Sequence, residues 1–353
     1  MTERRQHTPR RPTLRMVAER AGVSTATVSY VFSGRSGSSS GAGVAEATAA
    51  KVLAAAEELN YRPNSAARAI RTGRTGMIQL SLHMLSDPWS LAVADAVNVE
   101  ANRHGLTTLI LADGDWHAAL DRVESDVAYL DGIELDEDAV SKLGDLVRRG
   151  QRLVVFTERR LDPDGFDVVR SDAIPGCEIA MDHLLERHTR IGALTAEGAV
   201  RLAPTRVTRY TPYLDRMAAA GLDVDPAWTA TYGDSQSSAF EAAVGLLSRR
   251  ERPEAIYATT DFAAIAAINA AHMLGLRVPH DVAVIGIGNT PDARLVAPTL
   301  TTVGPTDFFA RQARIITDRA LAPDGSAPRV HEFPWSLFRG ASTDLDAPAL
   351  RSR

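Results

Sequence analysis

The chain has 353 residues, of which 45% are hydrophobic and 24% are charged, and this length suggests two or three folded units with sizeable cores. Cys177 is the single cysteine, which excludes a disulfide framework and a multi-cysteine zinc site and fits a reducing compartment. Apolar runs stay well short of the roughly 18–20 residues that a membrane span needs. Residues 1–12 are charged and lack the apolar segment of a secretory signal, so we expect a cytoplasmic protein.

The net charge of −5 is divided unevenly along the chain. Residues 1–76 contain 12 Lys and Arg and 5 Asp and Glu, whereas the rest of the chain contains 27 and 39. A basic N-terminal segment on an acidic body is typical of a nucleic-acid-binding protein with a separate second function. The alternative is a disordered basic tail over residues 1–12, but the positive charge continues as far as Arg74.

Residues 13–32 predict two short helices joined by a turn. Apolar residues recur at helical spacing from Thr13 onward, Gly22 and Val23 indicate a turn, and Ser24 can cap a second helix. A helix, a glycine turn and a short helix in this order are typical of a helix-turn-helix, whose second helix enters the major groove of DNA. The alternative is an ordinary small helical bundle.

The second helix would read DNA bases with its outward side. We expect Val28 and Val31 to pack inward. The outward side then presents four residues, namely Thr25, Ala26, Ser29 and Tyr30. A serine- and glycine-rich loop over 33–43 follows, and a third helix is predicted over about 45–59, ending before Pro63.

From Met77 onward, short apolar segments alternate with helical ones. The predicted strands are 77–82, 107–112, 132–135, 153–157, 191–195, 255–259 and 282–287, with further strands over about 300–340. The predicted helices are about 89–104, 117–129, 138–149, 175–188, 206–220, 236–250, 261–274 and 307–321. Such alternation indicates an α/β fold with parallel sheets covered by helices on both faces. Its length indicates two lobes, with a ligand site between them beyond the carboxyl ends of the strands.

Two segments carry a resemblance to a known family. TLRMVAERAGVSTATVSYVFSG (13–34) and KVLAAAEELNYRPNSAARAIRTGRTG (51–76) resemble the DNA-binding head and hinge of the LacI/GalR family of bacterial transcriptional regulators. The resemblance continues through DGI (131–133), ATTDFAAIAAINAAHMLGLRVPHDVAVIGIGN (258–289) and RGAST (339–343). It implies an all-α helix-turn-helix domain followed by a two-lobed core like that of periplasmic sugar-binding proteins. The implied divisions are a tail at 1–12, the head at 13–62, a hinge at 63–76, an effector and dimerisation domain at 77–343 and a tail at 344–353.

The resemblance also implies DNA contacts, residue by residue. The base-reading positions fall on Thr25, Ala26 and Tyr30, and a tyrosine cannot make the bidentate contact to guanine that an arginine makes. In the hinge, an apolar wedge partly unstacks a base step in the minor groove. The remaining implied contacts are Thr48 and Tyr61 at phosphates and Asn64, Ala67 and Ile70 in the hinge, with Ile70 as the wedge.

The implied effector cleft has three main candidates. Trp89 is expected to stack on a sugar ring, and Arg209 to donate to two neighbouring hydroxyls or to a carboxylate. Asp261 is expected to contact the effector, to cap its helix, or both. The structural alternatives are a packed tryptophan, a surface arginine and a helix cap. The weaker candidates are Glu158, His83, Asp87 and Asn289.

Together, these features predict a sequence-specific DNA-binding transcriptional regulator, a repressor controlled by a small molecule, with a sugar as the first choice. A homodimer is expected to read a pseudo-palindromic operator. Because residues 344–353 carry no heptad repeat, we expect no coiled-coil tetramer. Three alternatives stay open. The regulator could respond to a purine-type corepressor or to a protein partner, or the chain could be a solute-binding protein with no regulatory function. An enzyme would need a convergent catalytic or metal set, so we predict no catalytic residue, metal or cofactor.

Overall fold

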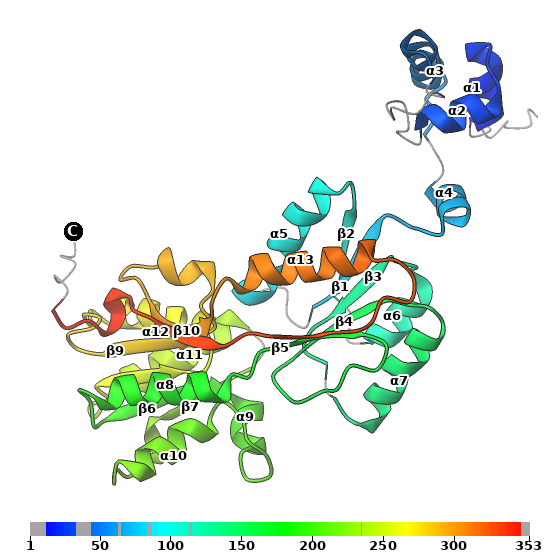
Figure 1. Ribbon diagram of the computed structural model, residues 1–353. Helices are drawn as coiled ribbons and strands as arrows, with labels where there is room; N and C mark the ends of the chain where they lie inside the picture. Colours follow the sequence, from blue (N-terminus) through cyan, green and yellow to red (C-terminus); the bar gives the residue numbers. More distant parts are fainter. Residues whose placement is uncertain are drawn as a thin grey trace, which may run out of the picture. The chain divides into compact units, whose positions relative to one another are not determined.

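The computed structural model describes residues 12–32, 44–62, 65–82, 87–112, 115–133, 135–233 and 235–346. The chain divides into two compact units, one up to Thr75 and the other from Gly76 onward (Figure 1). This division falls at the end of the predicted hinge segment. The finer boundaries at 12, 62 and 343 stay predictions.

The first unit is helical, as predicted. Its helices are α1 (Leu14–Ala21), α2 (Thr25–Phe32), α3 (Glu46–Glu58) and α4 (Ser65–Thr72). The first three helices share a small core in which Val17, Val28 and Val52 are fully buried. Leu53, the neighbour of Val52 on α3, is 53% exposed, because successive residues of a helix point in different directions and the Leu53 side chain faces away from that core.

The turn between α1 and α2 has the predicted chemistry. Gly22 ends α1 with a φ of 68°, a left-handed conformation that glycine adopts without steric cost. The Ser24 hydroxyl accepts a hydrogen bond from the backbone N–H of Thr27 at 3.1 Å and so caps α2. Val28 and Val31 are buried on the inner side of α2. The helix-turn-helix predicted from the sequence is therefore formed.

The first lobe of the second unit is built on a parallel sheet. The strands follow the order β11-β5-β4-β3-β1-β2, and every pair between neighbours is parallel. The elements are β1 (Met77–Ser81), α5 (Pro88–Arg103), β2 (Thr107–Leu111), α6 (Trp116–Arg122), β3 (Val127–Leu130), α7 (Glu137–Arg148), β4 (Leu153–Thr157), β5 (Asp167–Arg170), α13 (Phe308–Leu321) and β11 (Val330–Glu332).

Helices cover both faces of this sheet. Tyr129 packs among residues of α5 and α13, whereas its neighbours Ala128 and Leu130 pack among residues of α6 and α7. Alternate side chains of β3 are therefore buried on opposite faces, as a parallel sheet between two helical layers requires. This layering leaves the carboxyl ends of the strands as the place for polar groups.

The second lobe repeats this plan. Its strands follow the order β12-β10-β9-β8-β6-β7, all parallel except for the antiparallel pair of β10 and β12. The elements are α8 (Ile174–Leu185), β6 (Ile191–Ala196), α9 (Glu197–Leu202), α10 (Thr211–Ala219), η1 (Pro226–Trp228), β7 (Thr229–Tyr232), α11 (Gln236–Leu247), β8 (Ala255–Ala258), α12 (Asp261–Met273), β9 (Ala283–Ile287), η2 (Pro291–Arg294), β10 (Thr301–Pro305), β12 (Trp335–Phe338) and η3 (Ala341–Thr343).

The chain crosses between the lobes at segments 171–173, 306–307 and 333–334 (Figure 1). Two of these crossings are tied together, because the indole N–H of Trp335 donates to the Ser171 hydroxyl at 2.8 Å. The predicted two-lobed α/β core is confirmed. In the described parts of the chain, no helix is both long and apolar enough to cross a membrane.

One strand and one helix differ from the prediction. The strand predicted at 132–135 lies at Val127–Leu130, and the helix predicted over 117–129 already ends at Arg122. Periodicity cannot separate a four-residue buried strand from the end of a buried helix. The short strands β5 and β7 and the short helix α9 were not predicted, for the same reason.

Substitution of Gly340 tests how closely the C-terminal segment packs against Thr299 and Leu300. A Cβ added at Gly340 would lie 2.5 Å from backbone atoms of Thr299 and Leu300, whereas one added at Gly245 would meet nothing within 4 Å. We expect Gly340→Ala to reduce the free energy of unfolding by about 1–3 kcal/mol. Gly245→Ala, on helix α11, should leave stability unchanged or raise it. Urea unfolding of the full chain measures both, and equal stability of the two variants would contradict the packing.

Candidate functional site

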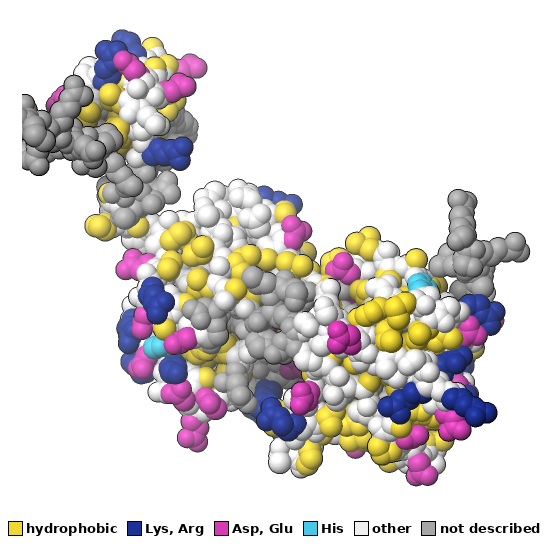
Figure 2. All heavy atoms as spheres, turned by 180° about the vertical axis from the view of Figure 1, so that it is seen from behind, with side chains coloured by type: hydrophobic (Ala, Val, Ile, Leu, Met, Phe, Trp, Pro, Cys, Tyr) yellow, Lys and Arg dark blue, Asp and Glu magenta, His cyan; other side chains and the backbone are white. Residues whose placement is uncertain are grey.

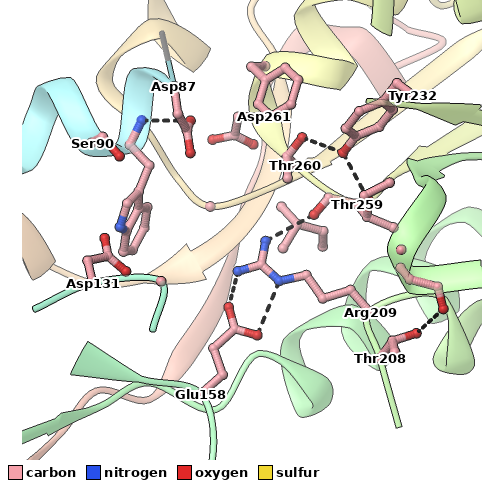
Figure 3. A pocket seen from close by; sticks show the side chains of 18 of the residues that line it. Asp87, Ser90, Asp131, Glu158, Thr208, Arg209, Tyr232, Thr259, Thr260 and Asp261 are labelled. Carbon is pink, nitrogen blue, oxygen red and sulfur yellow. Dashed lines mark hydrogen bonds and ion pairs between the residues drawn. The ribbon is translucent and has the colours of Figure 1, made fainter. Parts of the chain in front are cut away.

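A cavity of about 590 Å³ lies between the two lobes of the second unit. Residues that follow strands of both sheets line it (Figure 3). In sheets of this type, ligands bind beyond the carboxyl ends of the strands, where helix N-termini and loops meet. The observed cavity therefore stands where the alternation of strands and helices predicted a ligand site.

Three carboxylates line the first-lobe side of the cavity. Asp131 follows β3 directly and Glu158 follows β4 directly, while Asp87 precedes the first residue of α5. The Asp87 carboxylate accepts a hydrogen bond from the backbone N–H of Trp89 at 3.0 Å and caps α5. Because β1, β3 and β4 are neighbours in the sheet, the loops after them converge and bring these carboxylates to one wall.

The second lobe contributes mainly hydroxyl groups. Thr259 and Thr260 follow β8, and Tyr232 ends β7. The Tyr232 hydroxyl lies 3.2 Å from the Thr259 hydroxyl and 3.0 Å from the Thr260 hydroxyl. Figure 3 shows these three side chains together on the side of the cavity opposite to Asp87 and Asp131.

Arg209 joins the two walls. It comes from the second lobe, before α10, and its guanidinium forms a bidentate ion pair with the Glu158 carboxylate of the first lobe. Another guanidinium N–H donates to the Thr259 carbonyl oxygen at 3.0 Å. Burial alone would lower the pKa of Arg209, but the charge and hydrogen bonds of Glu158 hold this pKa above its usual value. Arg209 is thus a positioned cation inside the cavity.

Asp261 lies at the inner end of the cavity and is only 1% exposed. Its carboxylate accepts hydrogen bonds from the Thr290 backbone N–H at 2.7 Å, from the Thr290 hydroxyl at 2.9 Å and from the Thr302 hydroxyl at 2.5 Å. Burial raises the pKa of Asp261 to about 6 against the opposing effect of these hydrogen bonds. The cap of α12 is Thr260, so the alternative of Asp261 as a helix cap is wrong.

Asp131 is a cavity residue that the site prediction missed. Burial raises its pKa to about 7, and the neighbouring charges of Asp87 and Glu158 add to this effect. Behind it, the hydroxyl of the fully buried Tyr129 accepts a hydrogen bond from the Gln312 amide at 2.6 Å. The signal that could have found Asp131 is its position after a buried strand, but that strand had been placed too late in the sequence.

Trp89 is both packed and part of the cavity wall. Its ring centroid lies 4.6 Å from that of Phe308, 5.0 Å from that of Phe309 and 5.9 Å from that of Phe156. These aromatic contacts restrict the orientation of the half-buried indole, which still lines the cavity. The two interpretations of Trp89 made from the sequence are therefore compatible.

The structure brings most of the predicted effector contacts together. The predicted residues that line the cavity are Asp87, Trp89, Glu158, Arg209 and Asp261. Asn289 does not line it: its backbone has a φ of 53° and its side-chain amide donates to the Pro305 carbonyl oxygen at 3.1 Å. His83 lies outside the described residues. The cavity residues that the sequence did not indicate include Asp131, Arg159, Arg206, Tyr232, Thr259 and Thr260.

The predicted DNA contacts lie on the first unit. Thr25 and Ala26 are exposed at the start of α2, and Ser29 and Tyr30 are partly exposed. Ile70, on α4, is 88% exposed, which is unusual for an apolar side chain and leaves it available to a partner. Thr48 and Tyr61 are partly exposed and Ala67 is exposed, while Asn64 lies outside the described residues.

Within the described ranges, no group of three or more His, Cys, Asp or Glu side chains is placed to hold a metal ion. The side chains that line the cavity offer hydrogen bonds, ion pairs and aromatic contact.

Comparison with known proteins decides the family. Residues 13–64 match the family of bacterial regulatory proteins called the lacI family, and residues 181–343 match the periplasmic binding protein-like domain. The transcriptional repressor PurR of Serratia proteamaculans (strain 568) is 33% identical over 345 residues, which cover 94% of this chain and 97% of PurR. The chain belongs to the LacI family. It is thus a DNA-binding transcriptional regulator with an effector domain, and the family is not one of enzymes.

Solved structures agree with this LacI-family assignment. A complex of the transcriptional regulator CelR with cellobiose is 26% identical, covers 94% of this chain and all of its own, and has a TM-score of 0.59. The lac repressor dimer, bound to operator and to the anti-inducer ONPF, shows the same fold at 21% identity and a TM-score of 0.70, covering 95% of this chain and 99% of its own.

The raised pKa of Asp131 predicts how the free energy of unfolding depends on pH. The folded regulator holds a proton on Asp131 up to about pH 7, whereas an unfolded aspartate loses it near pH 4. The contribution of Asp131 to stability is therefore complete below about pH 4 and is lost as the pH rises to about 7. Asp131→Asn should flatten this dependence and raise the free energy of unfolding at pH 8 by at least about 1 kcal/mol.

Urea unfolding at pH 5 to 8 measures this effect. The matched control is Asp162→Asn, because the Asp162 side chain is 83% exposed and lies outside the cavity. The control should follow the parent protein at every pH. An Asp131→Asn variant that is less stable than the parent at pH 8 would contradict the burial of a disfavoured charge.

Proposed function

We propose that this LacI-family regulator is a repressor that binds its operator as a homodimer in the cytoplasm, and that a sugar in the interlobe cavity controls its affinity for DNA. The observation that carries the proposal is the cavity itself, which combines an aromatic wall with paired and unpaired charged groups. The three parts of the proposal, namely the effector, the DNA and the dimer, rest on different residues.

The cavity has the groups that sugar recognition needs. Sugar hydroxyls both donate and accept hydrogen bonds, and carboxylates such as Glu158 accept them while the Arg209 guanidinium donates two in parallel. The indole of Trp89 offers an apolar wall to the apolar face of a sugar ring. A volume of about 590 Å³ is within the range of small-molecule sites. The complex of the related CelR with cellobiose supports a sugar as the effector here.

The first unit has the surface that an operator needs. The exposed Thr25 and Ala26 allow close approach to base edges, and Tyr30 adds a hydroxyl and an aromatic edge. Ile70 is proposed as the wedge that parts a base step in the minor groove. The lac repressor, which has the same fold, is a dimer on its operator, and this supports a pseudo-palindromic operator read by two copies.

The second unit has apolar surface for a partner copy. Leu91 and Val99 on α5 are 54% and 47% exposed, and Ile110 on β2 is 42% exposed. Figure 2 shows hydrophobic side chains at several places on one face of this unit. These exposed apolar side chains support an interface between two copies of the chain.

Effector and operator are coupled through the lobes. Glu158 belongs to the first lobe and Arg209 to the second, so a sugar that inserts its hydroxyls between them changes the preferred lobe arrangement. This change is proposed to reach the DNA-binding unit through the hinge segment. By linkage, sugar and operator then alter each other's affinity by the same factor.

The experiment that tests the repressor starts from DNA. The purified protein is incubated with fragmented DNA of its source organism, and the retained fragments are footprinted with and without a panel of sugars and a purine base. A palindromic footprint that one sugar weakens or strengthens is expected. Tyr30→Ala is the control for readout and should lose preference at one base position while keeping salt-sensitive non-specific binding. Retention without any sequence preference would refute operator binding.

A substitution at Arg209 should abolish the response to the effector without changing DNA binding. Arg209→Ala removes the guanidinium from the cavity but leaves α2 unchanged, so operator affinity should stay within a few-fold of the parent value. The response to the sugar should be lost, because the hydrogen bonds of a charged donor are worth about 1.5–3 kcal/mol. Gel-shift titrations with and without sugar measure both quantities. The matched control is Arg201→Ala on α9, an exposed arginine outside the cavity, and an unchanged response of the Arg209 variant would remove Arg209 from the site.

A further inference from the structure

The charges of the effector cavity are not equally available to a ligand. Of the four carboxylates in its wall, Glu158 is engaged by the Arg209 guanidinium, and Asp261 already accepts three hydrogen bonds. A carboxylate has about four acceptor positions, so Asp261 has little capacity left. Asp87 caps α5 through the backbone N–H of Trp89.

Asp131 is different from these three. Among the described residues, no Lys, Arg or His nitrogen lies within 4.0 Å of its carboxylate. The groups that face Asp131 are Asp87 before α5, Glu158 after β4, Arg209 before α10, Tyr129 on β3 and the backbone N–H of Gly132, which donates a hydrogen bond to it. The two carboxylates oppose its ionisation, and Arg209 is already paired with Glu158. Arg159 and Arg206 also line the cavity, but neither has a nitrogen within 4.0 Å of the Asp131 carboxylate. Figure 3 shows Asp131 on the same side of the cavity as Asp87, across from Arg209.

A buried carboxylate without a cation beside it is costly when it is ionised. Taking a charge out of water is unfavourable unless an opposite charge or hydrogen bonds replace the lost hydration. Two neighbouring carboxylates increase this cost further. A neutral hydroxyl at Asp131 would leave the ionised carboxylate without an opposite charge, whereas a ligand cation would provide one.

The aromatic wall of the same cavity also suits a cation. Trp89 lines the same cavity, and its indole is held by three phenylalanines. Indole is the aromatic ring that attracts cations most strongly. An ammonium group has three N–H donors, which matches two nearby carboxylates and an aromatic ring.

We propose that the sugar bound in this cavity carries a protonated amino group, and that Asp131 accepts its hydrogen bonds beside Trp89. This inference rests on the proposed sugar effector and specifies its chemical class as an amino sugar. Asp131 is then a residue that determines specificity, because it separates amino sugars from neutral sugars of the same shape.

The test compares matched sugars on the full-length protein at pH 7.5. Isothermal titration calorimetry measures binding of glucose and glucosamine, galactose and galactosamine, and mannose and mannosamine. The N-acetyl form of each amino sugar is included, because acetylation keeps the nitrogen and removes its charge. For the ring stereochemistry that binds, the amino sugar should bind at least about tenfold more tightly than both the neutral and the N-acetyl forms, since a charge-assisted hydrogen bond contributes about 1.5–3 kcal/mol.

Two variants assign the preference to Asp131. In Asp131→Asn, the affinity ratio of amino sugar to neutral sugar should fall to near one, while the neutral sugar keeps its affinity within a few-fold. In the exposed control Asp162→Asn, the ratio should stay at the parent value. Circular dichroism confirms that both variants are folded. An amino-sugar preference that persists in Asp131→Asn would overturn the role of Asp131.

A pH series adds a readout that a purely structural role would not change. The pKa of Asp131 is about 7, so lowering the pH from 7.5 to 5.5 protonates the carboxylate, while the amine of the ligand, which like an α-amino group titrates near about pH 8, becomes fully charged. The preference for the amino sugar should therefore shrink over this range in the parent protein and stay flat in Asp131→Asn.

The outcomes distinguish the two proposals. A neutral hexose that binds as tightly as its amino form, or more tightly, overturns the amino-sugar inference and leaves the sugar effector standing. If no member of the panel binds or changes operator retention, both the amino-sugar inference and the proposed hexose effector fail. A preference for the amino form that requires Asp131 supports both.

Discussion

The bidentate ion pair between Arg209 and Glu158 is the interaction on which the effector cavity depends. One partner belongs to each lobe, so the pair holds both walls in one arrangement. It also determines which charges a ligand meets. Glu158 is paired with the guanidinium, while the first-lobe wall also carries the carboxylates of Asp87 and Asp131, and the second-lobe wall presents the hydroxyls of Tyr232 and its threonine neighbours.

This arrangement has a physical basis in the direction of the strands. Parallel strands place all their carboxyl ends at one edge of a sheet, and two such sheets, joined by short crossings, place those edges around one cavity. The bond from the Trp335 indole to the Ser171 hydroxyl ties two crossings together. The lobes are connected by short segments, and each lobe keeps its own packed core.

Much of the fold follows from local pattern. The helix-turn-helix could be predicted because Gly22 and Ser24 set the turn and cap through their own backbone and side-chain chemistry. Six of the twelve strands that the two sheets contain in the described residues could be predicted at their observed places, because buried parallel strands are short apolar runs between helices. The run Val127–Leu130 could not be assigned correctly, since four apolar residues at the end of a helical pattern are compatible with either structure until the sheet provides hydrogen-bond partners.

The sequence by itself determined the family, the helix-turn-helix, the two-lobed core and five of the cavity residues, because motif and periodicity are local properties. Only the tertiary structure decided the chemistry of the cavity. Asp131 became a candidate when neighbouring strands brought it beside Asp87 and Glu158. Asn289 was found outside the cavity lining, with its amide on the Pro305 carbonyl. Such effects depend on which groups meet across the fold, and the burial and charge of a side chain are set by neighbours that lie far away in the sequence.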